Sequence, residues 1–207
     1  MAMNRFPITN VEGDLVAQHR NPDEKFYASL ELNQVAFPKT GMVVSQTPLG
    51  EVFTRETPCE NGMWVVGDKA AGAINPPEAA TDAPIGIVYT TEKEYDDYHM
   101  GLQRFGRKVA GDYPRVGLLG VGDTVTTNCL QYDTSDFADD DALDAALKAI
   151  DTTPLYVVPG VAGSGAAKAV PQIVDEAPDA GIYAKIVKYY TIPNGGKGVK
   201  YQIVSLG

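Results

Sequence analysis

The stretch GIYAKIVKYYTI at residues 181–192, followed by VKYQIVSL at residues 199–206, decides the fold class. Both segments are rich in β-branched and aromatic residues with alternating apolar positions, a pattern that is typical of β-strands. The residues between them, PNGGKG at 193–198, include an Asn-Gly pair, which is the strongest short-range signal for a chain reversal. The sequence therefore predicts that the chain ends in an antiparallel hairpin.

Turn-forming residues are frequent along the whole chain. The 207 residues include 21 glycines and 14 prolines, which demand many reversals and disfavour long helices. We expect a mainly β fold with one or two short helices, arranged as a β-barrel or a sandwich-like body. Further strands are predicted at 26–32, 41–46, 84–90, 115–119, 123–130 and 154–159, and a hairpin is predicted in which 51–57 pairs with 63–66 across Asn61-Gly62.

The clearest helical segment lies at residues 139–150. Leu143, Leu147 and Ile150 share one apolar stripe at helical spacing. Aspartates in the first turn and Lys148 in the last turn complement the helix dipole. A single β-rich domain over residues 26–207 is therefore expected to contain this helix, and a weaker helix is predicted at 91–102.

An extended N-terminal arm is predicted at residues 1–25, because Pro7 and Pro22 interrupt any sustained periodicity. Fully extended, such an arm spans roughly 80 Å at about 3.3 Å per residue, whereas a compact body of this length has a diameter on the order of 45 Å. The arm can therefore reach a neighbouring subunit, with Phe6 and Ile8 as apolar contacts. The alternative is that it wraps its own subunit.

The chain is acidic, with a formal net charge of -10 and a pI of about 4.6. A nucleic-acid-binding protein has to neutralise closely spaced phosphates, so DNA and RNA are not expected partners. The sequence contains no apolar run of about 18 residues that would cross a membrane, and no secretory signal. We expect the protein to be made in a cytosol-like compartment and not to bind membranes.

Few residues of the sequence suggest catalysis or metal binding. Cys59 and Cys129 lie too far apart in the sequence for a zinc motif or a disulfide framework, and we expect both to be small core residues. His19 and His99 stand outside any catalytic or metal-binding motif. The aspartates at 139–141 lack the spacing of a calcium loop. We therefore expect no enzyme and no catalytic, cofactor-binding or metal-binding residues.

The segment GVAGSGAAK at residues 160–168 is the nearest approach to a nucleotide-binding loop. Such a loop needs Gly-Lys followed by Ser or Thr, whereas Gly165 is followed here by Ala-Ala-Lys. Pro171 also interrupts any helix that would follow. The sequence predicts a mobile Gly/Ala loop in which Lys168 has no nucleotide to bind.

Tyrosine is the one residue type whose distribution suggests binding. Tyrosine supplies a large area and a polar tip at subunit contacts, but cross-strand pairs within a sheet explain the same residues equally well. Both interpretations remain open for the tyrosines at 89, 95, 98, 113, 183, 189, 190 and 201.

Five short segments carry a family resemblance: ENGM at 60–63, YPRVGLL at 113–119, VGDTVTTN at 121–128, VKYY at 187–190 and KYQI at 200–203. In these segments the chain resembles virion structural proteins of tailed bacteriophages, and most of all the small head proteins that decorate or cement the capsid. Residues 1–58 show no such resemblance.

The resemblance implies a β-rich, non-catalytic protein present in many copies on the outer surface of an icosahedral capsid. Its expected partners are the major capsid protein and copies of itself, and its expected location is the virion, after synthesis in the cytoplasm of the bacterial host. Two alternatives remain: a phage tail tube or baseplate subunit, and a bacterial β module that binds a carbohydrate or peptide.

Overall fold

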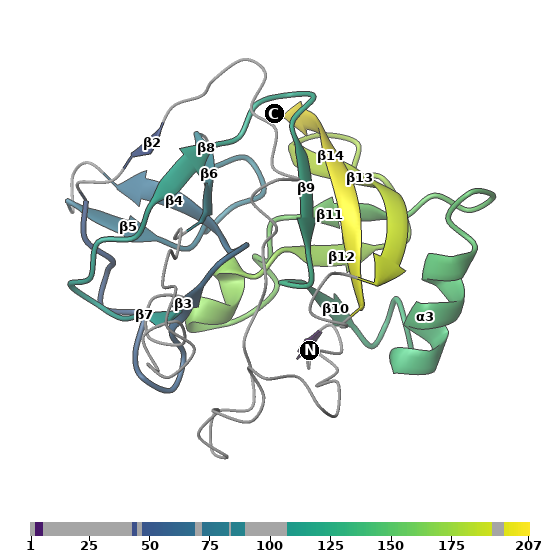
Figure 1. The fold of residues 1–207 in the computed structure, drawn as a ribbon, viewed down its shortest axis with the longest axis horizontal. Coiled ribbons are helices and arrows are strands. Elements are labelled where there is room, and N and C mark those ends of the chain that lie inside the picture. The colour runs from purple at the N-terminus through teal and green to yellow at the C-terminus, as the bar shows by residue number, and fades with distance from the viewer. Residues whose placement is uncertain are drawn as a thin grey trace.

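The computed structural model describes residues 3–5, 43–44, 47–68, 72–82, 84–89, 107–191 and 197–207. Within these residues the fold is mainly β, as predicted, and two sheets lie side by side with one α-helix at the far end of the larger sheet (Figure 1). Both sheets are open, so the described part of the chain forms no closed barrel.

The elements are short until the last two strands. In chain order they are β1 (Met3–Arg5), β2 (Val43–Val44), β3 (Cys59–Glu60), β4 (Trp64–Asp68), β5 (Ala73–Asn75), β6 (Ile85–Val88), β7 (Arg107–Lys108), β8 (Val116–Leu118), β9 (Thr124–Thr127), β10 (Gln131–Asp133), α3 (Asp140–Lys148), β11 (Tyr156–Val158), the 3-10 helix η2 (Gly165–Ala169), β12 (Gln172–Val174), β13 (Ile182–Thr191) and β14 (Lys197–Leu206).

Among the described residues, the large sheet has seven strands in the order β1-β10-β12-β11-β13-β14-β9, and only its β10–β12 pair is parallel. The small sheet, as far as the structure describes it, has five antiparallel strands in the order β2-β8-β6-β4-β5. The strands β3 and β7 pair with each other in a separate two-stranded sheet. The predicted C-terminal hairpin is confirmed as β13 paired with β14, from Ile182 opposite Leu206 to Thr191 opposite Lys197.

The main core lies where the inner face of the large sheet meets the small sheet and α3. Trp64 of β4 donates a 2.9 Å hydrogen bond through Nε1 to the hydroxyl of Tyr201 on β14, and the two rings meet edge to face at 5.8 Å. Both side chains are fully buried, so this bond satisfies the indole N–H in an apolar environment. Leu143 and Leu147 of α3 pack into the same core.

The predicted helix is confirmed at Asp140–Lys148, and its start follows from its cap. Asp139 takes an extended conformation, and its Oδ1 accepts a 2.8 Å hydrogen bond from the backbone N–H of Ala142. Tyr132 donates to Asp140 and Tyr189 donates to Asp144, each at 2.5 Å. These bonds fasten α3 to β10 and β13.

The predicted hairpin of 51–57 with 63–66 is wrong. Thr54 Oγ1 accepts hydrogen bonds from the backbone N–H groups of Glu56 and Thr57, both at 3.2 Å, and so bends the chain at 54–57, where a strand was expected. Gly62, with φ of 92°, does reverse the chain, but it connects β3 to β4, which pair with different partners.

A turn at 120–123, closed by a 3.0 Å hydrogen bond from the Asp123 N–H to the Gly120 carbonyl oxygen, also lies between strands that pair with different partners. Both flanking strands form as predicted, as β8 and β9, but β8 belongs to the small sheet and β9 to the large sheet. Here the turn carries the chain from one sheet to the other. The expected strands within 84–90 and 154–159 are confirmed as β6 and β11, and β2 falls within 41–46.

Several predictions fall on residues outside the described part of the chain: the strand at 26–32, the helix at 91–102, His19, His99 and the anchors Phe6 and Ile8. Of the predicted arm, Met3–Arg5 is described. It forms β1, which pairs with β10 of its own chain.

Candidate functional site

The outward face of the C-terminal hairpin is the candidate site. In β13, Ile182, Ala184 and Ile186 are buried, and Tyr183 and Lys185 alternate with them on the other side of the sheet. In β14, the buried residues Val199, Tyr201 and Ile203 alternate with Lys200 and Gln202 in the same way. The hairpin therefore has an apolar inner face and a polar outer face.

A β-bulge in β13 places two lysines on the same outer face of the sheet. Two residues three positions apart in a regular strand point to opposite sides of the sheet. Lys185 lies opposite Gln202 and Lys188 lies opposite Lys200, with a register shift at Val187 between the two pairs. Because Gln202 and Lys200 share a face, the bulge places Lys185 and Lys188 on one face as well.

Tyrosines lie among these lysines. The outward residues, which we call the lysine face, are Tyr156, Tyr183, Lys185, Lys188, Tyr190, Lys200 and Gln202. Tyr156 lies opposite Lys185 across β11 and β13, and its ring meets that of Tyr183 edge to face at 6.1 Å. The Lys188 ammonium lies 5.3 Å from the centroid of the Tyr190 ring, where a cation–π attraction orients it.

The electrostatics of the lysine face differ from those of the rest of the chain. Residues 182–206 contain four lysines and no acidic residue, so the remainder carries a formal charge of -14 against -10 for the whole. Lys188 and Lys200 are direct cross-strand partners, and like charges in that position destabilise a sheet. No carboxylate in the described residues forms an ion pair with Lys185, Lys188 or Lys200.

Exposed apolar side chains lie on the same hairpin as the lysines. Val187 and Val204 are 45% and 41% exposed and are two of the four large hydrophobic residues that stand out as exposed in the described part of the chain. Tyrosines are enriched in protein–protein contacts and charged side chains lie at the polar rim of such contacts, so exposed valines and half-buried tyrosines bordered by lysines fit a contact of this kind. The lysine face can therefore bind an acidic surface through both charge and apolar area.

Lys197, the fourth lysine of the hairpin, has a different role. Its ammonium lies 5.7 Å from the Tyr189 ring, on the side of α3. The pKa of Asp144 on that helix is lowered, first by the hydrogen bond from Lys148, next by that from Tyr189, and to a smaller extent by the charges of Lys148 and Lys197. Lys197 therefore interacts with groups of its own chain.

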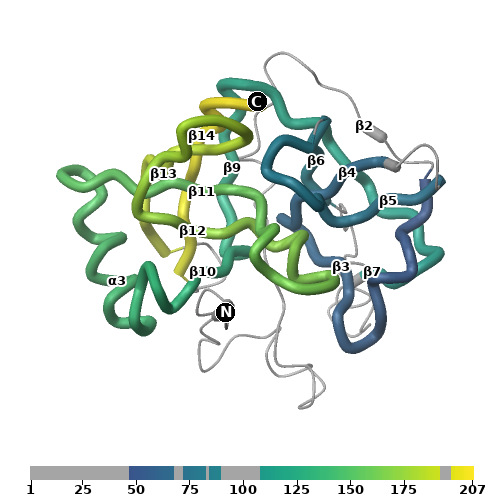
Figure 2. The backbone as a smooth tube through the Cα atoms, turned by 180° about the vertical axis from the view of Figure 1, so that it is seen from behind, coloured from purple at the N-terminus to yellow at the C-terminus, as the bar shows by residue number. Residues whose placement is uncertain are grey.

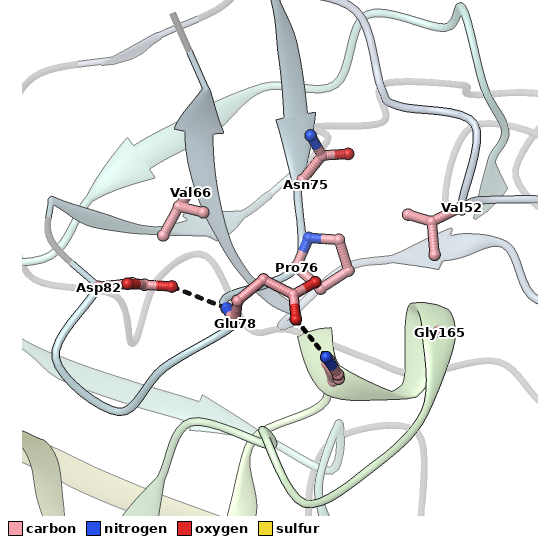
Figure 3. A pocket seen from close by; sticks show the side chains of 8 residues that line it. Val52, Val66, Asn75, Pro76, Glu78, Asp82 and Gly165 are labelled. Carbon is pink, nitrogen blue, oxygen red and sulfur yellow. Dashed lines mark hydrogen bonds and ion pairs between the residues drawn. The ribbon is translucent and has the colours of Figure 1, made fainter. Parts of the chain in front are cut away.

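A surface cavity of about 450 Å³ lies between η2 and the small sheet, and Figure 3 shows the side chains that line it. Lys168 of η2 forms an ion pair with Glu78. Asp82 accepts hydrogen bonds from the backbone N–H groups of Glu78 and Ala79, at 2.7 and 2.9 Å. The charged groups of this cavity therefore already bind one another or their own backbone.

The predicted mobile loop at 160–168 is packed. Seen from behind, this segment lies between the two sheets (Figure 2), and Ala166 and Ala169 are buried in a second core with residues of the small sheet. A Cβ added to Gly160 would lie 2.0 Å from the carbonyl oxygen of Val170. Glycine is required here because the backbones approach closely. That Lys168 binds no nucleotide stays a prediction, although its pairing with Glu78 is consistent with it.

The cysteine prediction is confirmed, since Cys59 and Cys129 are fully buried free thiols. Burial is the main cause that raises the pKa of Cys59, and the neighbouring Cys129 adds to it. Both interpretations of the tyrosines stay predictions: Tyr201 is a core residue, and Tyr113 is 61% exposed. No group of three metal-ligating side chains occurs among the described residues, and no helix described there could span a membrane.

Reasoning from the sequence missed the lysine face. The signal that could have found it is the absence of acidic residues from 182–206 in an otherwise acidic chain. Comparison with known protein families, with curated proteins and with solved structures found no match to this chain.

Proposed function

We propose that this protein is a non-catalytic structural subunit that binds the outer surface of a tailed-bacteriophage capsid as a decoration or cement protein, with the lysine face as a contact surface. Its partners are the major capsid protein and copies of itself. It works in the virion, after synthesis in the cytoplasm of the bacterial host.

The observation that carries this proposal is the cross-strand pair of Lys188 and Lys200. Like charges opposite each other cost stability, and natural sequences depart from such local rules mainly at functional sites. An acidic partner surface offsets the repulsion when it binds, so the arrangement is more stable in an assembly than in the isolated subunit. The resemblance of the segments at 187–190 and 200–203 to phage virion proteins falls on the same hairpin.

Co-sedimentation with capsids that lack the subunit tests the proposal. Wild-type protein should pellet with the shells in a fixed ratio to the major capsid protein, and Lys185→Glu should pellet at least about tenfold less, because like-charge contacts cost several kcal/mol at an interface. Arg55→Glu is the matched control, since Arg55 is also exposed and lies outside the hairpin. It should bind as wild type does.

The outcome also separates the alternatives. Binding to tail tubes or baseplates in place of shells would show that the protein is a tail subunit. Binding to neither, with retention on a carbohydrate or peptide ligand, would overturn the structural role.

A further inference from the structure

We propose that Lys188, Lys200 and Thr126 form an oxyanion-binding site within the lysine face. The site takes a small dianion such as phosphate in the isolated subunit, and a carboxylate of the neighbouring subunit in the assembly. Only the second occupant rests on the proposed function. The inference adds a threonine to the contact surface and names the chemical group that the two lysines bind.

The three residues are neighbours on three adjacent strands. Lys188 of β13 lies opposite Lys200 of β14, and Lys200 lies opposite Thr126 of β9. Direct partners in an antiparallel pair project from the same face of the sheet, so the three side chains form one row across the lysine face. Neighbouring strands lie about 4.8 Å apart, and lysine has a flexible four-carbon stem. Both ammonium groups can therefore reach one anion above Lys200.

Thr126 supplies an observation that is independent of the lysines. Its side chain has no exposed surface, and its Oγ1 has no hydrogen-bond partner among the described residues. A buried polar atom without a partner costs free energy, and a bound ion is one explanation for such an atom in a native protein. A threonine side chain is shorter than a lysine side chain, so this hydroxyl lies nearer the sheet than the two ammonium groups. An oxyanion that the lysines attract can accept its hydrogen bond.

The charges determine the class of ligand. Neither Lys188 nor Lys200 forms an ion pair with a carboxylate of the described residues, and like charges in direct cross-strand contact repel each other. A dianion balances both ammonium groups, and its several oxygens accept hydrogen bonds from them and from a hydroxyl at once. A polymer of phosphates such as a nucleic acid is disfavoured, because the remainder of the chain carries a formal charge of -14.

Isothermal titration calorimetry of the purified full chain with inorganic phosphate tests the site directly. Lys200→Gln and Thr126→Val should each raise the dissociation constant at least about tenfold relative to wild type, because each removes a hydrogen bond to a charged group. Thr124→Val is the control for the threonine, since Thr124 lies opposite Gln202, one row away on the same strand. Lys197→Gln is the control for the lysine, and both controls should bind within about twofold of wild type.

Thermal melting gives a second readout for Thr126→Val. Without phosphate, this substitution should not lower the melting temperature, because valine has nearly the same shape and removes an unsatisfied hydroxyl. Phosphate should raise the melting temperature of wild type, since a ligand that binds only the folded state stabilises it, and should raise that of the variant less. A variant that melts lower than wild type without phosphate would overturn the role of the hydroxyl, because it would show that the hydroxyl is satisfied within its own chain.

Competition tests the occupant in the assembly. Phosphate should reduce co-sedimentation of wild-type protein with shells, relative to sodium chloride at the same ionic strength, because a carboxylate of the shell needs the same donors. Thr126→Val should also reduce shell binding, although it leaves the net charge unchanged. Shell binding that neither phosphate nor this substitution weakens would overturn the carboxylate as the second occupant.

Wild-type protein that binds no phosphate would overturn the inference, as would variants that bind phosphate like wild type. Retention of a single-stranded oligonucleotide, lost in Lys200→Gln, would overturn it in favour of a nucleic-acid surface. Absence of phosphate binding together with normal shell binding would leave the proposed function standing without this site. Phosphate binding that depends on Lys200 and Thr126, without any binding to shells, would leave the site standing without the proposed function.

Discussion

The two faces of the β13–β14 hairpin share one backbone and follow different rules. On the inner face, side chains are apolar and buried, and the buried hydroxyl of Tyr201 is paired with Trp64. On the outer face, Lys188 lies opposite Lys200. The inner face buries apolar side chains and pairs its buried hydroxyl, whereas the outer face places two like charges opposite each other. The inner face therefore follows the requirements of folding, and the outer face is the surface for which we propose a binding role.

The largest difference in the free energy of unfolding is expected between substitutions at two neighbouring residues of β14. Ile203 is 1% exposed and Val204 is 41% exposed. Truncation of a buried isoleucine leaves a cavity, so Ile203→Ala should lower the free energy of unfolding by roughly 2 to 5 kcal/mol. Val204→Ala should change it by less than about 0.5 kcal/mol. Urea denaturation measures both, and equal effects would remove the distinction between the faces.

Removal of a tyrosine hydroxyl should also lower the free energy of unfolding by different amounts on the two faces. Tyr201→Phe leaves the buried Trp64 N–H without its acceptor, and an unsatisfied buried donor costs about 1 to 3 kcal/mol. Tyr183→Phe on the lysine face is the matched control and should cost less than about 0.5 kcal/mol. If thermal unfolding shows the same loss for both variants, the Trp64–Tyr201 bond does not stabilise the core as described.

Replacement of lysine by glutamine should change the free energy of unfolding in opposite directions at Lys200 and at Lys168. Lys200→Gln relieves the repulsion with Lys188 and should raise the free energy of unfolding by about 0.2 to 1 kcal/mol, while it weakens shell binding. Lys168→Gln removes the ion pair with Glu78. Because Glu78 is largely exposed, that change should lower the free energy of unfolding by at most about 1 kcal/mol. Destabilisation by Lys200→Gln would mean that Lys200 is satisfied within its own chain.

The smallest effect concerns pH. The pKa of Asp144 is lowered below 3.8, chiefly by the hydrogen bond from Lys148. A lowered carboxyl pKa stabilises the fold above pH 3.8, and this contribution is lost as the pH falls through the folded-state pKa. The stability difference between wild type and Asp144→Asn should therefore be constant near neutral pH and shrink below pH 3.8. A difference that grows with acid would reverse the sign assigned here.

Local patterns predicted the elements that are stabilised locally. The helix at 140–148 was predictable because Asp139 caps it and Leu143 and Leu147 share a stripe. The terminal hairpin was predictable because strand alternation and an Asn-Gly turn coincide. Both depend on residues that are close in the sequence.

Pairings between distant segments were not predictable. The strands β10 and β12 have three residues each and owe their conformation to partners 41 positions apart, as in Gln131 opposite Gln172. The segment 51–57 has strand composition, but the Thr54 hydroxyl stabilises turns instead. The lysine face depends on the bulge at Val187, and a register shift is visible only once the partner strand is known.

A cryo-electron microscopy reconstruction of the assembled virion tests the central claim most directly, namely that the lysine face is a subunit contact on the capsid. The map should place this chain on the outer head surface, with Lys185, Lys188 and Lys200 covered by acidic residues of a neighbouring subunit. A map in which the chain occupies only the tail, or in which these three lysines face solvent in every copy, would contradict it.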